Sequence, residues 1–306
     1  MCRLIDDILV FLEASGFECK VQMRSGLDVI CTQTLNGGHK KVILPMEITA
    51  RTPEEAEAHA GTASKLIEEL SLSYLGHPII ITEDRWHSQH EMMKSRVLAH
   101  LEVFDQVYAR NCEIRRIDKI TAADFLAANH SYGDSSNRYR YGLFLKRHTG
   151  HIASEGSETW KYPPGTLVAV ATFSNARKWV KGEQTIRSYE WIRYASLPGL
   201  RISGGMGKLL KTFIEEVQPD DIMSYADLEW SEGTVYEQLG FKLEGQKDQV
   251  LFGVDSEWNR SPVKPGMKEG GKTGVTDPNV IAGQPGNMFY MNFGSNKYRL
   301  KLTEYE

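Results

Sequence analysis

Several features that mark special protein classes are missing from this sequence. The chain contains no run of 18 or more apolar residues, which argues against a membrane-spanning helix. Asp6 and Asp7 interrupt the first apolar stretch, and a secretory signal would not contain them. The four cysteines form no C-x-x-C pair and have no histidine at ligand spacing, which favours reduced thiols. We therefore expect a cytoplasmic protein with no membrane partner. The sequence does not indicate its oligomeric state.

The charge of the chain is small overall but unevenly distributed. Its 306 residues suggest two domains, and the formal net charge is −4. Residues 137–211 contain thirteen basic and only four acidic residues, so this segment carries +9 and the rest of the chain −13. Tyrosine and tryptophan are interleaved with the basic residues. This pattern indicates an anionic partner, either a phosphate-bearing cofactor or a nucleic acid, or else an ordinary solvated face.

Residues 1–105 have the pattern of a small αβββαβα domain. Apolar spacing predicts a helix over 3–14, and Thr52 with Glu55 forms a capping box that opens a second helix. A second capping box, Ser88 with Glu91, predicts a helix that continues to about residue 104. The predicted strands cover residues 18–24, 28–33, 41–49 and 78–82, with a hairpin turn at 36–38.

Residues 106–306 have the pattern of a larger domain with a mixed sheet and flanking helices, so the fold class is α/β (α+β). Thr121 is the expected cap of its first helix, and residues 260–287 read as a loop rich in glycine and proline. The predicted strands cover 112–117, 141–146, 167–173, 188–196, 221–226, 250–254 and 288–293. The predicted helices cover 121–128, 207–217 and 233–240.

A glycine-rich turn between a strand and a helix is the sharpest local signal. Gly204, Gly205 and Gly207 allow a close backbone approach, and the helix start that follows favours an anion such as a pyrophosphate. Lys208 adds a positive charge beside it. A plain strand-to-helix turn is the alternative interpretation.

The chain resembles the GNAT superfamily of acyl-CoA-dependent N-acyltransferases at two motifs. Arg201-Ile-Ser-Gly204 is similar to the first half of the superfamily motif R/Q-x-x-G-x-G/A, although Met206 stands at its second small position. The segment from Tyr236 to Phe241 is similar to the second motif, Y-E-x-L-G-F. The resemblance implies an N-acyltransferase that uses acetyl-CoA or another acyl-CoA. It also implies a cofactor site formed by Arg201, Ile202, Ser203, Gly204, Gly205, Met206, Gly207 and Lys208.

The chain also contains the segments Glu190-Trp-Ile-Arg193, Ser203-Gly-Gly and Met223-Ser-Tyr-Ala-Asp227. With these segments, and over most of residues 80–254, it looks like Mom-like DNA-modification acyltransferases and the C-terminal parts of phage Hef-like homing-endonuclease proteins. That resemblance implies functional roles for Arg193, Ser203, Asp227 and Tyr236. Their chemistry suits acyl transfer to a nucleic-acid base or another amine, with DNA as a candidate partner.

Each candidate residue has a chemical role and a structural alternative. Glu190 or Asp227 would be the base, Tyr236 would protonate the leaving thiolate, and Arg193 would hold a phosphate or carboxylate. His130 is a further catalytic candidate. The alternatives are that Tyr236 is a packed core residue, Asp227 a helix cap, Glu190 an outward-facing side chain and His130 a loop residue.

The first domain resembles a PD-(D/E)XK nuclease core of the very-short-patch-repair type. Asp28 and Glu47 would hold a divalent metal, and Lys65 lies on the following helix. Thr49 stands where the motif lysine belongs, so we expect a degenerate module that does not cleave DNA. A metal-dependent endonuclease and a non-catalytic DNA-binding module remain the alternatives for the whole chain.

Overall fold

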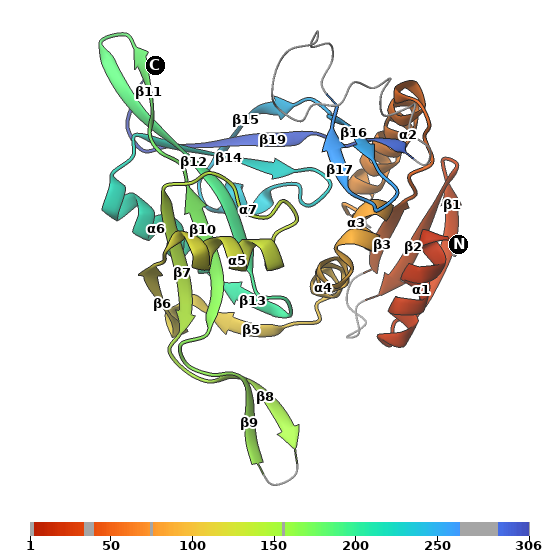
Figure 1. The fold of residues 1–306 in the computed structure, drawn as a ribbon, viewed down its shortest axis with the longest axis horizontal. Coiled ribbons are helices and arrows are strands. Elements are labelled where there is room, and N and C mark those ends of the chain that lie inside the picture. Colours follow the sequence, from red (N-terminus) through yellow and green to blue (C-terminus); the bar gives the residue numbers. More distant parts are fainter. Residues whose placement is uncertain (1–2, 34–39, 74–75, 155–156, 264–286, 306) are drawn as a thin grey trace. The chain divides into compact units, whose positions relative to one another are not determined.

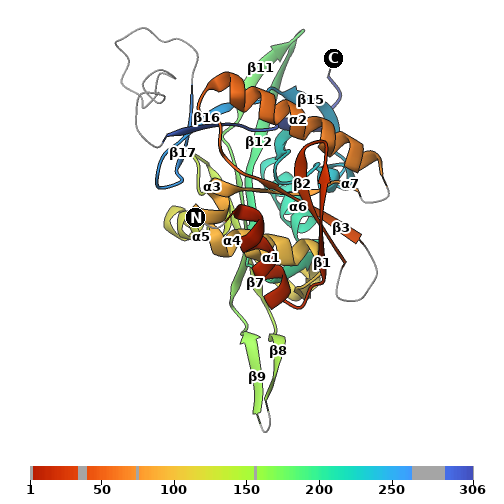
Figure 2. The same cartoon turned by 90° about the vertical axis from the view of Figure 1, so that its right-hand side faces the viewer.

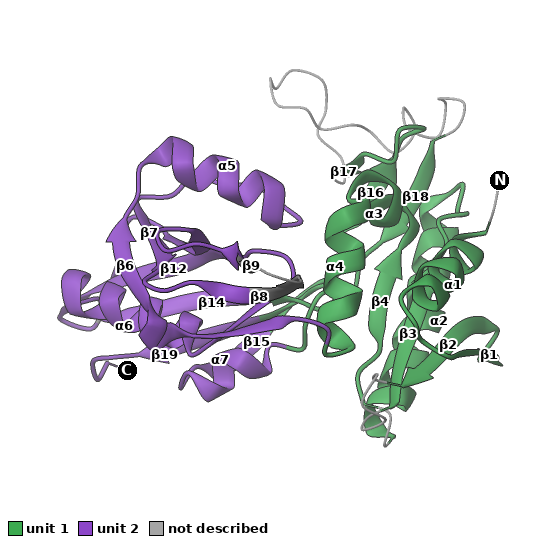
Figure 3. Cartoon of the chain, turned by 90° about the horizontal axis from the view of Figure 1, so that it is seen from below, with its two compact units in different colours: residues 1–102, 226–232, 246–296 green, residues 103–225, 233–245, 297–306 purple. Residues whose placement is uncertain are grey.

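The computed structural model describes residues 3–33, 40–73, 76–154, 157–263 and 287–305 (Figures 1 and 2). It has the α+β class expected from the sequence, with several mixed sheets. The chain forms two compact units (Figure 3). Residues 1–102, 226–232 and 246–296 form the first, and residues 103–225, 233–245 and 297–306 the second. Each unit consists of three separate stretches of the chain. The sequence predicted instead one continuous stretch for each domain, residues 1–105 and residues 106–306. The functions assigned to these two domains stay predictions. No helix in the described ranges is long and apolar enough to span a membrane.

The first unit is built on a four-stranded sheet in the order β1-β2-β3-β4. The first three strands are antiparallel, and β3 pairs with β4 in parallel. Leu66 and Leu70 of α2 pack against Val29, Leu44 and Ile80 of the sheet. The helices are α1 (Leu4–Ala14), α2 (Pro53–Leu72), α3 (Glu83–Ser88) and α4 (His90–His100). The strands are β1 (Cys19–Arg24), β2 (Leu27–Gln33), β3 (Lys40–Met46) and β4 (Ile79–Thr82), with β16 (Leu251–Val254), β17 (Arg260–Pro262) and β18 (Met288–Met291) in a second sheet.

Helix starts in this unit agree with one predicted cap and contradict another. Thr52 caps α2, accepting the amide hydrogen of Glu55. The prediction for Ser88 was wrong, because Ser88 ends α3 and its hydroxyl donates to the carbonyl of Asp84. The predicted hairpin turn at 36–38 and most of the predicted loop, residues 264–286, lie outside the described residues.

The second unit is built around a long sheet in the order β15-β19-β14-β12-β10-β7-β6, with β11 paired to β12. Helix α5 covers one face through Phe125 and Leu126, which contact Val170 and Ala195. Helix α6 packs on the opposite face of the sheet, where its Phe213 ring stacks on Phe173. The hairpin of β8 and β9 and the hairpin of β11 and β12 both extend from this sheet (Figure 1).

The helices and strands of the second unit follow the predicted order, and the unit contains several strands that were not predicted. The helices are α5 (Lys119–Asn129), α6 (Gly205–Val217) and α7 (Thr234–Gln238). The strands are β5 (Asp105–Tyr108), β6 (Cys112–Arg116), β7 (Tyr139–Leu145), β8 (Thr149–Ser154), β9 (Ser157–Tyr162), β10 (Leu167–Phe173), β11 (Arg177–Lys181), β12 (Gln184–Ser196), β13 (Leu200–Ser203), β14 (Asp221–Asp227), β15 (Lys242–Lys247) and β19 (Ser295–Lys301). Thr121 was predicted to cap α5, but the cap is Asp118, whose carboxylate accepts the Thr121 amide hydrogen at 2.8 Å.

Candidate functional site

The sheet of the second unit changes character where β12 meets β14. These strands are parallel, and their pairing covers only Ser188–Glu190 against Asp221–Met223. Both strands continue beyond this stretch, and the Ser224 hydroxyl donates to the Trp191 carbonyl at 2.9 Å. In open sheets, ligands bind beyond the carboxyl ends of parallel strands. A ligand site is therefore expected beside the stretch that follows Glu190 and Met223.

A bulge in β12 sets which side chains face this region. Thr172 of β10 pairs with Arg193, but the next residue, Phe173, pairs with Trp191, so Ile192 is the extra residue. Because a bulge adds one residue to the strand, two residues that are three positions apart across the bulge point to the same face of the sheet. Glu190 and Arg193 therefore share one face of the sheet, and the Glu190 carboxylate acts on the pKa of Arg193.

Arg193 is the centre of this group of residues. Its Nε donates to the Gly133 carbonyl at 3.1 Å, and its guanidinium lies 5.9 Å from the centre of the Tyr132 ring. Burial lowers the pKa of Arg193, while the charges of Glu190 and Asp134 oppose that shift. A partly buried guanidinium held in this way is suited to bind an oxyanion.

Tyr236 of α7 lies within electrostatic reach of Arg193 and bonds to Ser224. The two hydroxyl oxygens are 2.9 Å apart. The single Ser224 proton goes to the Trp191 carbonyl, which can only accept, so we assign the Tyr236 proton to the Ser224 oxygen. Burial raises the pKa of Tyr236, which keeps the phenol protonated at neutral pH. Tyr236 is also packed, since its ring stacks on Tyr298 at 5.3 Å.

His130 ends α5 and opens the loop that contacts Arg193. Its Nδ1 accepts the amide hydrogen of Tyr132 at 3.1 Å, so this nitrogen carries no proton in that arrangement. The His130 and Tyr132 rings lie 6.4 Å apart. His130 thus shapes the loop beside Arg193.

The glycine-rich turn is held by contacts within the second unit. Gly204 has φ of +75° and precedes α6, while a Cβ on Gly205 would lie 2.9 Å from the Ile202 side chain. The Ser203 hydroxyl accepts from Gln106 at 3.0 Å, and the Lys208 ammonium donates to the carbonyls of Ala109 and Cys112.

The other residues predicted for the cofactor site lie on both sides of this turn. Arg201 stacks on Phe104 at 5.2 Å, Ile202 is buried, and Met206 and Gly207 lie in the first turn of α6. The first amides of α6 have no partner within the helix, which is the general basis for anion binding at a helix start.

Asp227 belongs to the first unit, where it joins a buried network of charged side chains. Its Oδ2 lies 3.5 Å from the Arg85 guanidinium, and its Oδ1 accepts the Glu229 amide hydrogen at 2.9 Å. Asp227 is therefore not the helix cap that the sequence offered as its alternative role, because Gly233 is the N-cap of α7; its carboxylate stabilises a turn and forms an ion pair.

The network around Asp227 connects three segments of the first unit. Arg260 donates to Glu229 at 3.0 Å and to Asp84 at 2.8 Å, and Arg96 donates to the carbonyls of Glu229 and Trp230. Burial raises the pKa of Glu229, but the charges of Arg260 and Arg85 outweigh it and hold that pKa low. Burial lowers the pKa of Arg96 to about 9.

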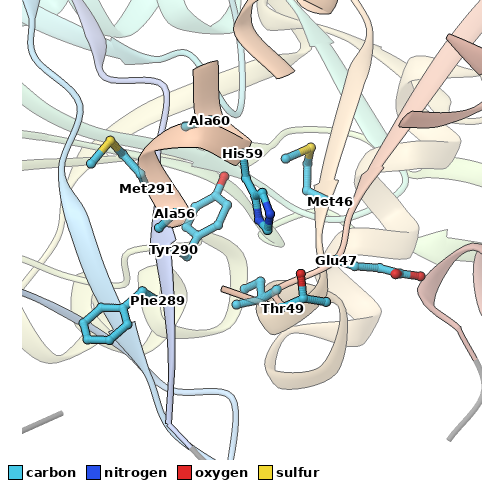
Figure 4. Close-up of a pocket in the computed structure, with 10 residues that line it drawn as sticks. Met46, Glu47, Thr49, Ala56, His59, Ala60, Phe289, Tyr290 and Met291 are labelled. Carbon is cyan, nitrogen blue, oxygen red and sulfur yellow. The ribbon is translucent and has the colours of Figure 1, made fainter. Parts of the chain in front are cut away.

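The nuclease-like carboxylates are joined by a cation of the chain itself. The Arg3 guanidinium lies 2.7 Å from Asp28 and 3.4 Å from Glu47. Within the described ranges, no three His, Cys, Asp or Glu side chains are grouped as a metal site. Thr49 and Lys65 are exposed. A small pocket lies next to Glu47, and His59, Thr49 and Tyr290 are among its lining residues (Figure 4).

Sequence reasoning missed several residues around Arg193. Tyr132, Asp134 and Ser224 all contact or influence the Arg193 and Tyr236 pair. Tyr132 and Asp134 lie in the polar loop after the predicted helix over 121–128, which contains a glycine and several residues that favour turns, and Ser224 lies in the predicted strand over 221–226. Their position beside Arg193 depends on the sheet register and on the bulge.

Comparison with known proteins adds little to this geometry. No family model matches the chain, and no curated protein matches it. Among solved structures, it is similar to one described as the crystal structure of a KacTA-DNA complex, at 18% identity and a TM-score of 0.26. That match covers 49% of this chain and 92% of the other. A TM-score of this size carries no argument, so the function is argued from the site.

Proposed function

We propose that the chain is an acyl-CoA-dependent N-acyltransferase of the GNAT type whose acceptor amine belongs to a nucleic-acid base. The observation that supports this most is the end of pairing between β12 and β14 beside Arg193, Glu190 and Tyr236. A candidate acid, a candidate base and an anion-binding side chain lie together at this place in the second unit. The resemblance of residues 201–204 and 236–241 points to the same chemistry.

The donor would bind where the two strands cease to pair with each other. Strand edges in such a region offer backbone donors and acceptors to an extended ligand such as the pantetheine arm of CoA. The first turn of α6 would then receive the phosphates of CoA. Because Lys208 and Ser203 already have partners in the chain, we assign the phosphate contacts to backbone amides of Gly205 and Met206.

The transfer step needs one proton removed and one proton supplied. The acceptor nitrogen attacks the thioester carbon, a C–N bond forms, and the C–S bond breaks. Glu190 accepts the proton that leaves the nitrogen, and Tyr236 gives its proton to the departing thiolate sulfur. Before the transfer this proton is donated to Ser224, which holds the phenol in position, and the O–H bond turns from Ser224 toward the sulfur as the thiolate leaves. Asp227 is left out of this scheme because its carboxylate is engaged with Arg85 and Glu229.

A nucleic-acid acceptor is supported by the charge of residues 137–211. The segment carries +9, and Trp179 and Trp160 are each more than a third exposed on its hairpins. Cationic and aromatic side chains together hold phosphates and stack unpaired bases. Binding to a single strand should therefore weaken steeply as salt concentration rises.

The test combines calorimetry with transfer of a radiolabelled acetyl group. Wild-type protein should bind acetyl-CoA and label a single-stranded oligonucleotide. Tyr236→Phe should lower kcat by about 10²–10⁴-fold, the range typical of a lost general acid. Tyr305→Phe is the matched control, since its hydroxyl bonds to Asp221 outside the site. Absence of acetyl-CoA binding would contradict the transferase proposal, and labelling of spermidine without any DNA binding would contradict the nucleic-acid acceptor.

A further inference from the structure

A row of three polar residues crosses the sheet of the second unit. Thr172 of β10 pairs with Arg140 of β7 on one side and with Arg193 of β12 on the other. Directly opposed residues in antiparallel strands point to the same face, with Cβ atoms about 5 Å apart. Two guanidinium groups therefore flank one threonine hydroxyl on a single face.

This face is the one that α5 covers, and the row lies beyond the end of that helix. Val170 and Ala195, two residues from Thr172 and Arg193 on their strands, pack against α5. The loop that follows α5 crosses toward the row, because Arg193 donates to Gly133 and Arg140 donates to the Asn137 carbonyl at 3.0 Å. The row is thus bordered by the loop from 130 to 137.

Three buried polar atoms at this place have no hydrogen-bond partner among the described residues: Thr172 Oγ1, Arg140 Nε and Asn137 Oδ1. Thr172 is fully buried. A buried polar atom without a partner is costly, and native proteins retain few of them. Two of the three atoms can donate a hydrogen and one can only accept, so together they match a ligand with an oxyanion and an N–H group.

The charges around the row have the same mixed character. Arg140 and Arg193 are positive, while Glu190 and Asp134 act on Arg193 as negative charges. A ligand that is only an anion would be attracted by the two arginines and repelled by the two carboxylates. A ligand that carries a phosphate and an amine would place the phosphate at the arginines and the amine toward the carboxylates. The exposed Tyr132 ring beside Arg193 offers a stacking surface for a planar group.

From this arrangement we infer that Arg140, Thr172 and Arg193 form a phosphate subsite for a nucleotide acceptor, with Asn137 accepting a hydrogen from the same ligand. The inference rests on the proposed acyl transfer for the role of the ligand as acceptor. The binding site itself rests on the register and on the unpartnered atoms. The phosphate can come from a nucleic-acid strand or from a free nucleotide, and these two sources share the same recognition chemistry.

The experiment compares ligands that differ only in the phosphate. Calorimetry should show that wild-type protein binds dAMP at least tenfold more tightly than deoxyadenosine. Thr172→Val, which replaces the hydroxyl by a methyl group of similar size, should reduce this ratio severalfold, and Arg140→Gln should bring it close to one. Lys242→Gln is the matched control, because Lys242 is exposed on β15, which β19 and β14 separate from β12, and it lies outside the +9 segment.

A labelled single-stranded oligonucleotide distinguishes the two sources. Loss of oligonucleotide affinity in Arg140→Gln, but not in Lys242→Gln, assigns the phosphate to a strand, while loss with dAMP alone assigns it to a free nucleotide. An unchanged preference for dAMP in both row variants, or an equal loss in Lys242→Gln, overturns the subsite. Acetyl-CoA binding, measured on the same proteins, tests the transferase proposal separately. Wild type that binds no acetyl-CoA but shows the row effect keeps the subsite and loses the transferase.

Discussion

Replacing Thr172 by valine should stabilise the ligand-free protein. Thr172 is fully buried, and its hydroxyl has no partner among the described residues. Valine has nearly the same shape, and it exchanges the hydroxyl for a methyl group. A buried hydroxyl that makes no hydrogen bond costs about 1–3 kcal/mol. Removing it should therefore raise the free energy of unfolding by about 1–2 kcal/mol.

That free energy corresponds to a measurable shift in melting temperature. The second unit has roughly 150 residues, for which 1 kcal/mol corresponds to about 2–4 °C. Differential scanning calorimetry without ligand should thus place the Thr172→Val transition about 2–8 °C above that of wild type. Nucleotide should raise the wild-type transition by more than that of the variant, because the variant has lost part of the subsite.

Thr32 provides the matched control for this measurement. It is also buried in a strand, but its hydroxyl donates to the Glu18 carbonyl at 2.9 Å. Thr32→Val should therefore destabilise the protein, by about 1 kcal/mol or more, because it leaves that carbonyl short of a partner. If Thr172→Val lowered the melting temperature as Thr32→Val does, the Thr172 hydroxyl would be satisfied in the free protein. The reasoning from the unpartnered atoms would then be refuted.

Two further predictions concern the first unit. Glu229→Gln should cost about 3–5 kcal/mol in urea unfolding, because it leaves Arg260 and Arg85 buried without their shared carboxylate, whereas exposed Glu57→Gln should be nearly neutral. Since the pKa of Glu229 is lowered in the folded state, the stability that its carboxylate contributes is present above about pH 4.3 and is lost as pH falls through the folded pKa. A difference in unfolding free energy between wild type and Glu229→Gln that stays constant down to pH 3 would contradict this. Because Arg3 joins Asp28 and Glu47, we expect no cleavage of duplex DNA with Mg²⁺ or Mn²⁺. Cleavage that disappears in Asp28→Asn and Glu47→Gln would restore the nuclease alternative.

Elements with strong local patterns could be predicted from the sequence. The apolar spacing of residues 4–12 gave α1 to within one residue, and the apolar run of β10 gave Leu167–Phe173. Strands β8, β9 and β19 were missed because their sequences are polar or mixed. β19 reads SNKYRLK, and it is ordered by its place between β15 and β14. Such strands depend on neighbours far away in the sequence, which a local pattern does not contain.

The candidate site shows the same division between local and distant information. The residue types at Glu190, Arg193 and Tyr236 could be selected by motif. Regular alternation, however, would place Glu190 and Arg193 on opposite faces of a strand, and only the bulge at Ile192 brings them to one face. Arg140 and Thr172 carried no motif at all. They become a candidate subsite only through the register of three strands.

Asp227 shows why a motif residue can be ambiguous even when its position is correctly identified. Strand β14 runs from residues of the second unit into Ala226 and Asp227 of the first, so one short motif serves two units. Loss of activity in Asp227→Asn would therefore have two explanations, since the carboxylate both pairs with Arg85 and accepts the Glu229 amide hydrogen. Asparagine keeps an oxygen for the amide but removes the charge that faces Arg85. A fall in unfolding free energy that equals the fall for Arg85→Met, with no further loss in the double variant, would assign Asp227 to the network. Loss of transfer with unchanged stability would instead return Asp227 to the reaction as a second base.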